Sequence, residues 1–110
     1  MISWEEFEKV DIRTGTIVEV KEFAKARKPA WQLKIDFGAE LGIKKSSAQI
    51  VHRYTKEELV GRQILAVVNF PPKQIANFMS ECLVLGVADE NGEIVLLSTE
   101  RKVENGKKVH

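Results

Sequence analysis

Cysteine, histidine and long hydrophobic runs are scarce in this chain of 110 residues. Cys82 is the only cysteine, and the two histidines, His52 and His110, belong to no metal-binding motif. The chain can therefore form no internal disulfide and offers no zinc ligand set. Its longest uninterrupted apolar run, residues 64–68, is far shorter than the ~20 residues that a membrane-spanning helix needs. We thus expect no disulfide scaffold, no metal centre and no membrane insertion.

The composition is that of one compact domain. Hydrophobic residues make up 44% of the chain and charged residues 30%, a balance typical of globular proteins. A chain of this length holds one hydrophobic core, so residues 1–110 are expected to form a single domain. The first six residues are acidic and lack the basic flank and apolar stretch of a secretory signal. We therefore expect a cytoplasmic protein.

Signatures of catalysis are also missing. Ser47 stands in no Gly-x-Ser-x-Gly setting, and pairing it with His52 as nucleophile and base would rest on sequence proximity alone. Gly86 and Gly92 are not followed by the Lys-Ser or Lys-Thr of a phosphate-binding loop. The sequence therefore predicts a non-enzymatic protein that needs no cofactor.

Apolar patterning predicts about five core strands. Residues 31–37 alternate apolar and polar side chains without interruption, which places one face in a core and the other in solvent. Residues 12–23 are rich in β-branched side chains and long enough to coil, with Gly15 available for a bulge. Two nearly continuous apolar runs follow at residues 63–70 and 82–87, and strands covered on both faces are expected there. A strand that returns antiparallel is expected at residues 94–97.

Caps and turns complete the predicted architecture. Capping boxes at residues 3–6 and 55–58 predict two short helices. Asn91-Gly92 predicts a hairpin turn, and Asn105-Gly106 predicts a terminal hairpin between residues 101–103 and 107–109. The predicted fold is therefore all-β: a five-stranded OB-fold barrel with short N-terminal and interstrand helices and a C-terminal hairpin extension.

Residues 69–80 form the most unusual segment of the chain. Pro71 and Pro72 cannot donate to a strand ladder, so we expect an ordered loop at a barrel mouth. Its apolar side chains could simply fold back on the core as a lid. Its polar side chains suit recognition of a base edge or of an extended peptide backbone. These are Asn69, Gln74, Asn77 and Ser80, beside Lys73.

Two further stretches could border the same mouth. The polar run at residues 44–49 serves equally well as a solvated edge strand or as part of a site. Residues 25–30 form a basic loop between the first two strands, where barrels of this type border their ligand groove. Residues 21–80 hold eleven basic and five acidic residues, so positive charge gathers in the middle of the chain.

Short motifs recur in a fixed order over nearly the whole chain, at residues 11–15, 35–38, 46–50 with Tyr54, 59–62, 68–73 and 80–86. Together they resemble the tRNA-binding-domain family. Ser-Ser-Ala-Gln at residues 46–49, combined with Asn-Phe-Pro-Pro at residues 69–72, is most similar to its CsaA-type branch, which is described as chaperones for protein export.

The resemblance implies an OB-fold homodimer with a ligand surface between Asn69 and Ser80. Asn77 stands where relatives commonly have Gly, and it best tolerates the left-handed backbone expected there. Met79 replaces a frequent basic residue, and residues 27–31 replace a His-Pro-x-Ala-Asp run of many tRNA-binding relatives. The differences at Met79 and at residues 27–31 favour the chaperone branch.

The first functional hypothesis is a chaperone that captures unfolded or presequence-like peptides for export. Apolar side chains would supply contact area and polar ones would bond the peptide backbone. The strand pattern also makes Trp31 a candidate for the core. The candidate residues are Trp31, Ser47, Gln49, Asn69, Phe70, Phe78, Met79 and Ser80.

The alternative is a tRNA-binding module that recognises phosphates and unpaired bases. Arg13 belongs to this set, although a structural ion pair with Asp11 or Asp36 is an equally good interpretation. The candidate residues are Arg13, Arg27, Lys28, Lys44, Lys45, Asn69, Lys73, Gln74 and Ser80.

Both ends of the chain carry apolar side chains on elements too short to be stable alone. A two-fold dimer would cover them, whereas in the alternative both ends fold back on their own barrel. The predicted interface residues are Trp4, Phe7, Val103 and Val109.

Overall fold

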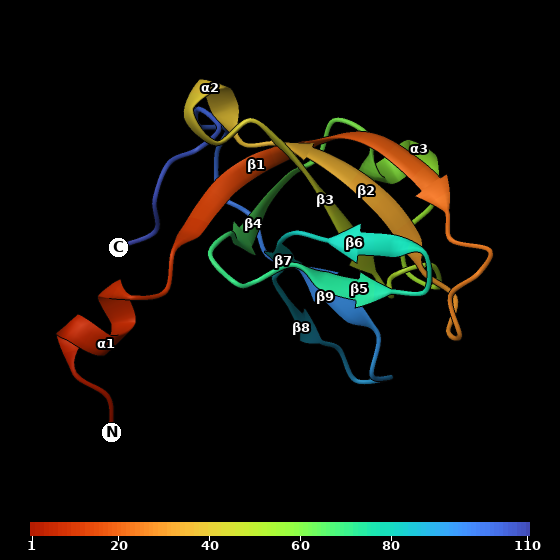
Figure 1. The fold of residues 1–110 in the computed structure, drawn as a ribbon, viewed down its shortest axis with the longest axis horizontal. Coiled ribbons are helices and arrows are strands. Elements are labelled where there is room, and N and C mark those ends of the chain that lie inside the picture. The colour runs from red at the N-terminus through yellow and green to blue at the C-terminus, as the bar shows by residue number, and fades with distance from the viewer.

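One long strand organises the molecule. In the computed structural model, which describes residues 1–110, β1 (Ile12–Glu22) pairs antiparallel with β2 (Trp31–Asp36) along one edge and with β4 (Gln63–Val67) along the other. β3 (Ile43–Ala48) lies beyond β2, and β7 (Leu83–Val84) lies beyond β4. The sheet order is therefore β3-β2-β1-β4-β7 (Figure 1).

The two outer strands of this sheet meet. The hydroxyl of Ser46 on β3 donates to the carbonyl of Cys82, just before β7, at 2.9 Å. Ser46 is buried, so this bond joins the sheet edges inside the protein. The result is the predicted OB-fold, a nearly closed five-stranded antiparallel barrel.

The core follows the alternation of β2. Leu33, Ile35 and Phe37 are almost completely buried, while Lys34 between them is exposed. Gly15 on β1 faces this cluster, and a Cβ there would lie 2.7 Å from Ile35 Cγ2 and from Phe37 Cε1. Gly15 therefore permits close approach of two strands. The expected bulge lies two residues later, between Ile17 and Glu19.

The two predicted helices form where their caps place them. α1 (Trp4–Glu8) and α3 (Lys56–Leu59) each begin with a complete capping box, at Ser3 and Thr55. A further single turn, α2 (Gly38–Leu41), was not predicted. The longest helix has only 5 residues, and none is long and apolar enough to cross a bilayer.

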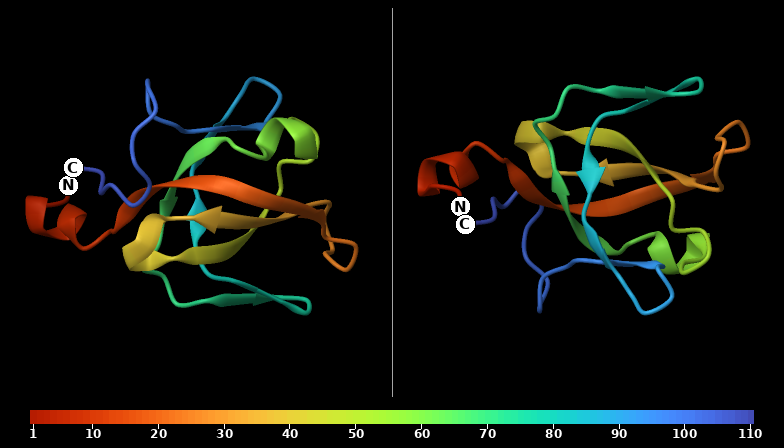
Figure 2. Two further views of the ribbon diagram at one scale, coloured as in Figure 1. Left: turned by 90° about the horizontal axis from the view of Figure 1, so that it is seen from above. Right: turned by 90° about the horizontal axis from the view of Figure 1, so that it is seen from below.

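Two hairpins flank the barrel mouth on opposite sides (Figure 2). β8 (Gly86–Ala88) and β9 (Ile94–Leu96) form the hairpin predicted at Asn91-Gly92. Residues 73–80, expected to be a loop, form a second hairpin of β5 (Lys73–Ile75) and β6 (Phe78–Ser80). The left-handed residue of its turn is Ala76, with φ of 54°, and not Asn77 as expected.

Residues 82–87 do not form the single covered strand that was predicted. The chain breaks into β7 and β8, because Leu85 N–H bonds to Leu65 O while Leu97 N–H bonds to Leu85 O. Leu83 and Val87 are about half exposed, so this segment has an open face.

The predicted C-terminal hairpin is wrong, because β1 offers better partners. β2 pairs with β1 only from Thr16 onward, so the edge at residues 12–15 has unpaired backbone groups. The last residues bond there instead: Gly106 N–H donates to Thr14 O at 2.7 Å, and Val109 N–H donates to Ile12 O at 2.8 Å. Arg13 and Lys108 form the bridge between these bonds.

Candidate ligand-binding groove

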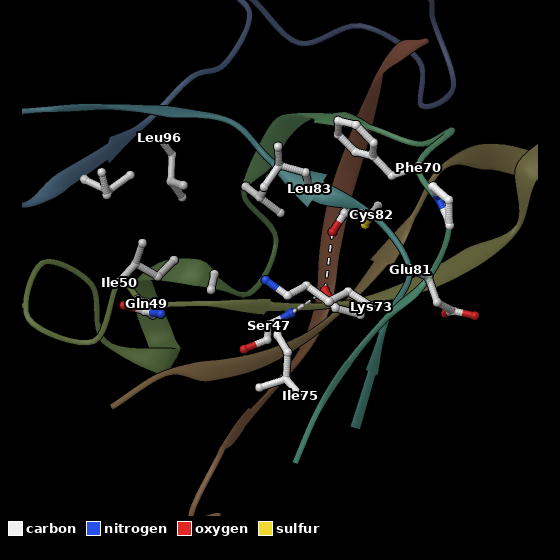
Figure 3. Close-up of a pocket in the computed structure, with 15 residues that line it drawn as sticks. Ser47, Gln49, Ile50, Phe70, Lys73, Ile75, Glu81, Cys82, Leu83 and Leu96 are labelled. Atoms are coloured by element: carbon white, nitrogen blue, oxygen red, sulfur yellow. Dashed lines mark hydrogen bonds between the residues drawn. The ribbon is translucent and has the colours of Figure 1, made fainter. Parts of the chain in front are cut away.

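An open cavity of about 660 Å³ lies at the barrel mouth between the two hairpins. Nine of its fifteen lining residues are hydrophobic, so we call it the apolar end of the groove. In Figure 3, Phe70, Leu83 and Leu96 lie along one side, and Gln49, Ser47 and Lys73 face them from the other.

A second cavity of about 610 Å³ continues from the first. The two share four lining residues: Ser47, Gln49, Lys73 and Ile75. The second cavity is also lined by Arg27 and Lys28 of the loop after β1 and by Gln74, and no acidic side chain lines it. We call it the basic end. The groove is therefore amphipathic along its length.

Three hydrogen bonds fix the β5–β6 hairpin to the edge of β3. Lys45 N–H donates to Glu81 Oε1 at 2.8 Å, and Glu81 N–H donates to Lys45 O at 2.7 Å. Ser47 N–H donates to Ser80 Oγ at 3.2 Å. These bonds use the outward-facing backbone groups of β3, so the hairpin stands as a fixed wall of the groove.

The wall ends before the strand edge does. Backbone groups of alternate residues in an antiparallel strand point to the same edge, so Gln49 continues the edge used by Lys45 and Ser47. Gln49 is exposed, and neither its backbone groups nor its side-chain amide forms a hydrogen bond within the chain. The groove thus presents unpaired donors and acceptors where its apolar and basic ends meet.

Cys82 lines the apolar end but its thiol is not reactive in character. Burial raises the pKa of the Cys82 thiol to about 11 from its ordinary value of 9.0, against the lowering effect of a hydrogen bond with Ser46. The thiolate is the nucleophile in cysteine chemistry. The sequence-based expectation of a small buried thiol is confirmed.

We expect this buried thiol to weaken the protein at alkaline pH. Because folding raises the pKa of the Cys82 thiol, the neutral thiol makes its full contribution to stability below pH ~9. The free energy of unfolding then falls by up to about 2–3 kcal/mol as pH rises toward ~11. Urea unfolding of the parent protein and of Cys82→Ala at pH 7 and near pH 10 measures the difference. Parallel losses in both proteins would contradict the expectation.

The groove gathers about half of the sequence-predicted residues. From the peptide set it holds four, Ser47, Gln49, Phe70 and Ser80. From the tRNA set it holds five, Arg27, Lys28, Lys73, Gln74 and Ser80.

Asn69 and Arg13 lie outside the groove and hold the ends of the chain. Asn69 Nδ2 donates to Lys9 O at 2.7 Å, and its Oδ1 accepts from Asp11 N–H at 3.0 Å. Arg13 Nε donates to Asp11 Oδ1 at 2.6 Å, and its Nη1 donates to Gly106 O at 2.9 Å. The hydrogen bond to Asp11 raises the pKa of the Arg13 guanidinium. Asn69 thus attaches the segment between α1 and β1 to the end of β4, and Arg13 attaches the C-terminal segment to β1.

The aromatic candidates of β2 and β6 also point elsewhere. Trp31 Nε1 donates to Tyr54 O at 3.0 Å, so its indole packs beside the core. The Phe78 ring packs on Phe23 with centroids 5.4 Å apart, and Lys45 Nζ lies 5.2 Å from its centroid. Two more candidates, Lys44 and Met79, do not line the groove.

Several groove residues were not predicted from the sequence. They are mostly apolar side chains of β5, β7, β9 and the loops that follow β3 and β4: Ile50, Pro71, Ile75, Leu83, Ile94 and Leu96. An aliphatic side chain in a strand pattern signals burial, and nothing in the pattern separates a core position from a cavity wall. Leu83 is half exposed although it lies in a strand, β7.

A family model described as a putative tRNA binding domain matches residues 12–108. The crystal structure of the CsaA chaperone protein from Picrophilus torridus is 53% identical to this chain, with a TM-score of 0.94 over 100% of both chains. That of chaperone CsaA from Bacillus anthracis str. Ames is also 53% identical, with a TM-score of 0.93 over 100% of this chain and 99% of the other.

Similarity extends to a domain of much larger proteins. Methionine–tRNA ligase of Bacteroides fragilis is 34% identical over 108 residues, which are 98% of this chain and 16% of the ligase. The chain thus spans about one sixth of the length of the curated relatives that it matches.

Proposed function

The chain belongs to the family of putative tRNA-binding domains, and on that basis we propose that it is a non-enzymatic chaperone whose groove binds extended segments of unfolded proteins. The observation that carries this proposal is the apolar end, where nine hydrophobic residues line an open cavity of about 660 Å³. Apolar side chains of a client would leave water there, which is the main driving force for such binding.

The open edge at Gln49 supports an extended ligand. A bound segment that runs along β3 past the hairpin wall can pair its backbone with the free groups of Gln49, as in β-strand addition. Backbone pairing is independent of sequence, so the groove suits many clients. We propose that these include preproteins with presequence-like segments, held in the cytoplasm before export.

A homodimer is part of this proposal. α1 has no buried residue, Trp4 is 85% exposed, and the helix projects from the barrel in every view (Figures 1 and 2). Val103 is 37% exposed, whereas Phe7 and Val109 are half-buried. We propose that two copies cover these side chains and present two grooves. The C-terminal segment bonds to its own β1, so α1 carries most of the proposed interface.

A tRNA ligand is the second candidate. Arg27, Lys28 and Lys73 line the basic end, which no acidic side chain lines, and the family model describes tRNA binding. Neutralising three phosphates of single-stranded RNA gives a slope of about −2 for log affinity against log salt. Binding of a peptide through burial of apolar side chains gives no comparable fall of affinity with salt.

We expect Phe70→Ala to weaken binding of a fluorescein-labelled, reduced and carboxymethylated client protein by about 5–30-fold, because an interface aromatic contributes ~1–2 kcal/mol. Met79→Ala is the matched control, since Met79 is 40% exposed and lies outside the groove. Fluorescence anisotropy at low and moderate salt measures both variants, and bulk tRNA is titrated in parallel.

A client that binds both variants equally contradicts the chaperone proposal. The same conclusion follows if tRNA binds with a slope near −2 while the client does not bind at all. Bulk tRNA that fails to bind at low salt contradicts the second candidate.

A further inference from the structure

We infer that the groove selects extended segments in which a carboxylate lies close to the apolar anchor side chains, and that it disfavours segments with basic flanks. Within a preprotein it therefore prefers unfolded parts with acidic flanks over the presequence itself, whose flank is basic. This inference rests on the proposed function and specifies its ligand. The apolar end does not specify the charge of the ligand, whereas the positive charge of the basic end does.

The cations of the basic end are available for a ligand. Arg27, Lys28 and Lys73 take part in none of the ion pairs of the structure, whereas Arg13, Lys21, Lys34 and Arg53 are paired with acids. No acidic side chain lines the cavity around them. A ligand carboxylate would therefore meet three uncompensated positive charges, and a ligand ammonium would be repelled by them.

The position of Lys73 sets the spacing between anchor and carboxylate. Lys73 lines both cavities, so the two ends of the groove adjoin at this side chain. Side chains on one face of an extended segment repeat every second residue, roughly 7 Å apart. A segment that places an apolar side chain in the apolar end thus brings the side chain about two residues away to the basic end.

Polyanions fit this arrangement less well than a peptide carboxylate. The chain as a whole carries a formal net charge of only +1, and the basic end adjoins a cavity lined mainly by hydrophobic residues. The one acid at the apolar end, Glu81, accepts a hydrogen bond from Lys45 N–H. A single carboxylate beside apolar side chains uses both ends of the groove, whereas a phosphate backbone uses only one.

Three synthetic peptides of one length test the inference. They share the core Ala-Leu-Phe-Val-Leu and differ only in the following residues, Ser-Asp-Asp, Ser-Ser-Ser or Ser-Lys-Lys, with a fluorescein at the N-terminus and an amidated C-terminus. Anisotropy near 50 mM salt is expected to rank them acidic, neutral, basic, with about 5–30-fold between the extremes. The ratio should shrink toward unity at high salt because ions screen these contacts.

Charge removal in the protein provides the matched comparison. Lys73→Gln is expected to reduce the acidic-to-basic affinity ratio at least about threefold. Lys102→Gln, which removes an exposed lysine outside both cavities, should leave that ratio unchanged.

Equal affinities for the three peptides, or a ratio that Lys73→Gln does not alter, overturn the inference while leaving the proposed capture of extended peptides intact. Failure of all three peptides to bind overturns the proposed function as well. Displacement of a bound acidic peptide by bulk tRNA, with tRNA binding lost in Lys73→Gln, would instead assign the basic end to phosphate and overturn the inference.

Discussion

Phe37→Ala is expected to lower the free energy of unfolding by about 3–5 kcal/mol, the largest effect on stability that we predict for one side chain. Phe37 is 1% exposed, and its ring lies so close to Gly15 that a Cβ added there would be 2.7 Å from Phe37 Cε1. Its removal leaves a cavity that this tightly packed region cannot fill, because Gly15 has no side chain to move. Urea unfolding followed by circular dichroism gives the difference directly.

Phe70→Ala is the control for the same chemical change at an exposed site. Phe70 is 54% exposed at the groove, so we expect a loss of less than about 1 kcal/mol. Similar losses for the two variants would contradict the assignment of Phe37 to the core and Phe70 to the ligand surface.

Trp4→Glu is expected to convert the proposed homodimer into monomers at micromolar concentration. Trp4 is 85% exposed in one subunit, and a two-fold axis would place two copies of the new carboxylate in one interface. Loss of a buried interface Trp on each subunit raises the dissociation constant about 100-fold or more. Sedimentation velocity of the parent and variant proteins measures the change in mass.

Val60→Glu places the same charge on an exposed apolar position that follows α3, far from α1 (Figure 1). It should leave the dimer intact. An unmodified protein that sediments as a monomer contradicts the dimer, and a Trp4→Glu variant that remains dimeric removes α1 from its interface.

Strand alternation predicted most of the barrel, because burial of one face imposes a period of two on the sequence. Residues 31–37 show this pattern clearly, and β2 with Phe37 has the expected buried face. The same reasoning could not predict the β5–β6 hairpin. Pro71 and Pro72 indicated that pairing stops, but pairing resumes one residue later at Lys73, through a turn at Ala76 that contains no glycine.

The C-terminal error has a different cause. Asn105-Gly106 does form a turn, as its sequence predicts. Which backbone the following residues pair with depends on the free edge of β1 at residues 12–15, about ninety positions earlier in the chain. Local turn chemistry contains no information about that edge.

The candidate groove was predicted mainly in its polar part, with Phe70 as the one predicted apolar residue that lines it. Ser47, Gln49 and Ser80 stand out in the sequence because polar residues are unusual beside strands. Leu83 and Leu96 do not stand out, since only the convergence of two hairpins leaves them at a cavity. Asn69 shows the opposite case: its side-chain amide suits a ligand, but Lys9 O and Asp11 N–H, which lie between α1 and β1, already bond to both of its polar atoms.

The attachment of the C-terminal segment to β1 has a consequence for synthesis on the ribosome. Lys107 N–H bonds to Thr14 Oγ1 across 93 positions. At about 5–20 residues per second, β1 is made roughly 5–20 s before this partner. Until then the edge of residues 12–15 that faces away from β4 lacks its partner, and such an edge can pair with another chain. The nascent protein therefore passes through a stage in which it has the properties of the clients proposed for its mature form.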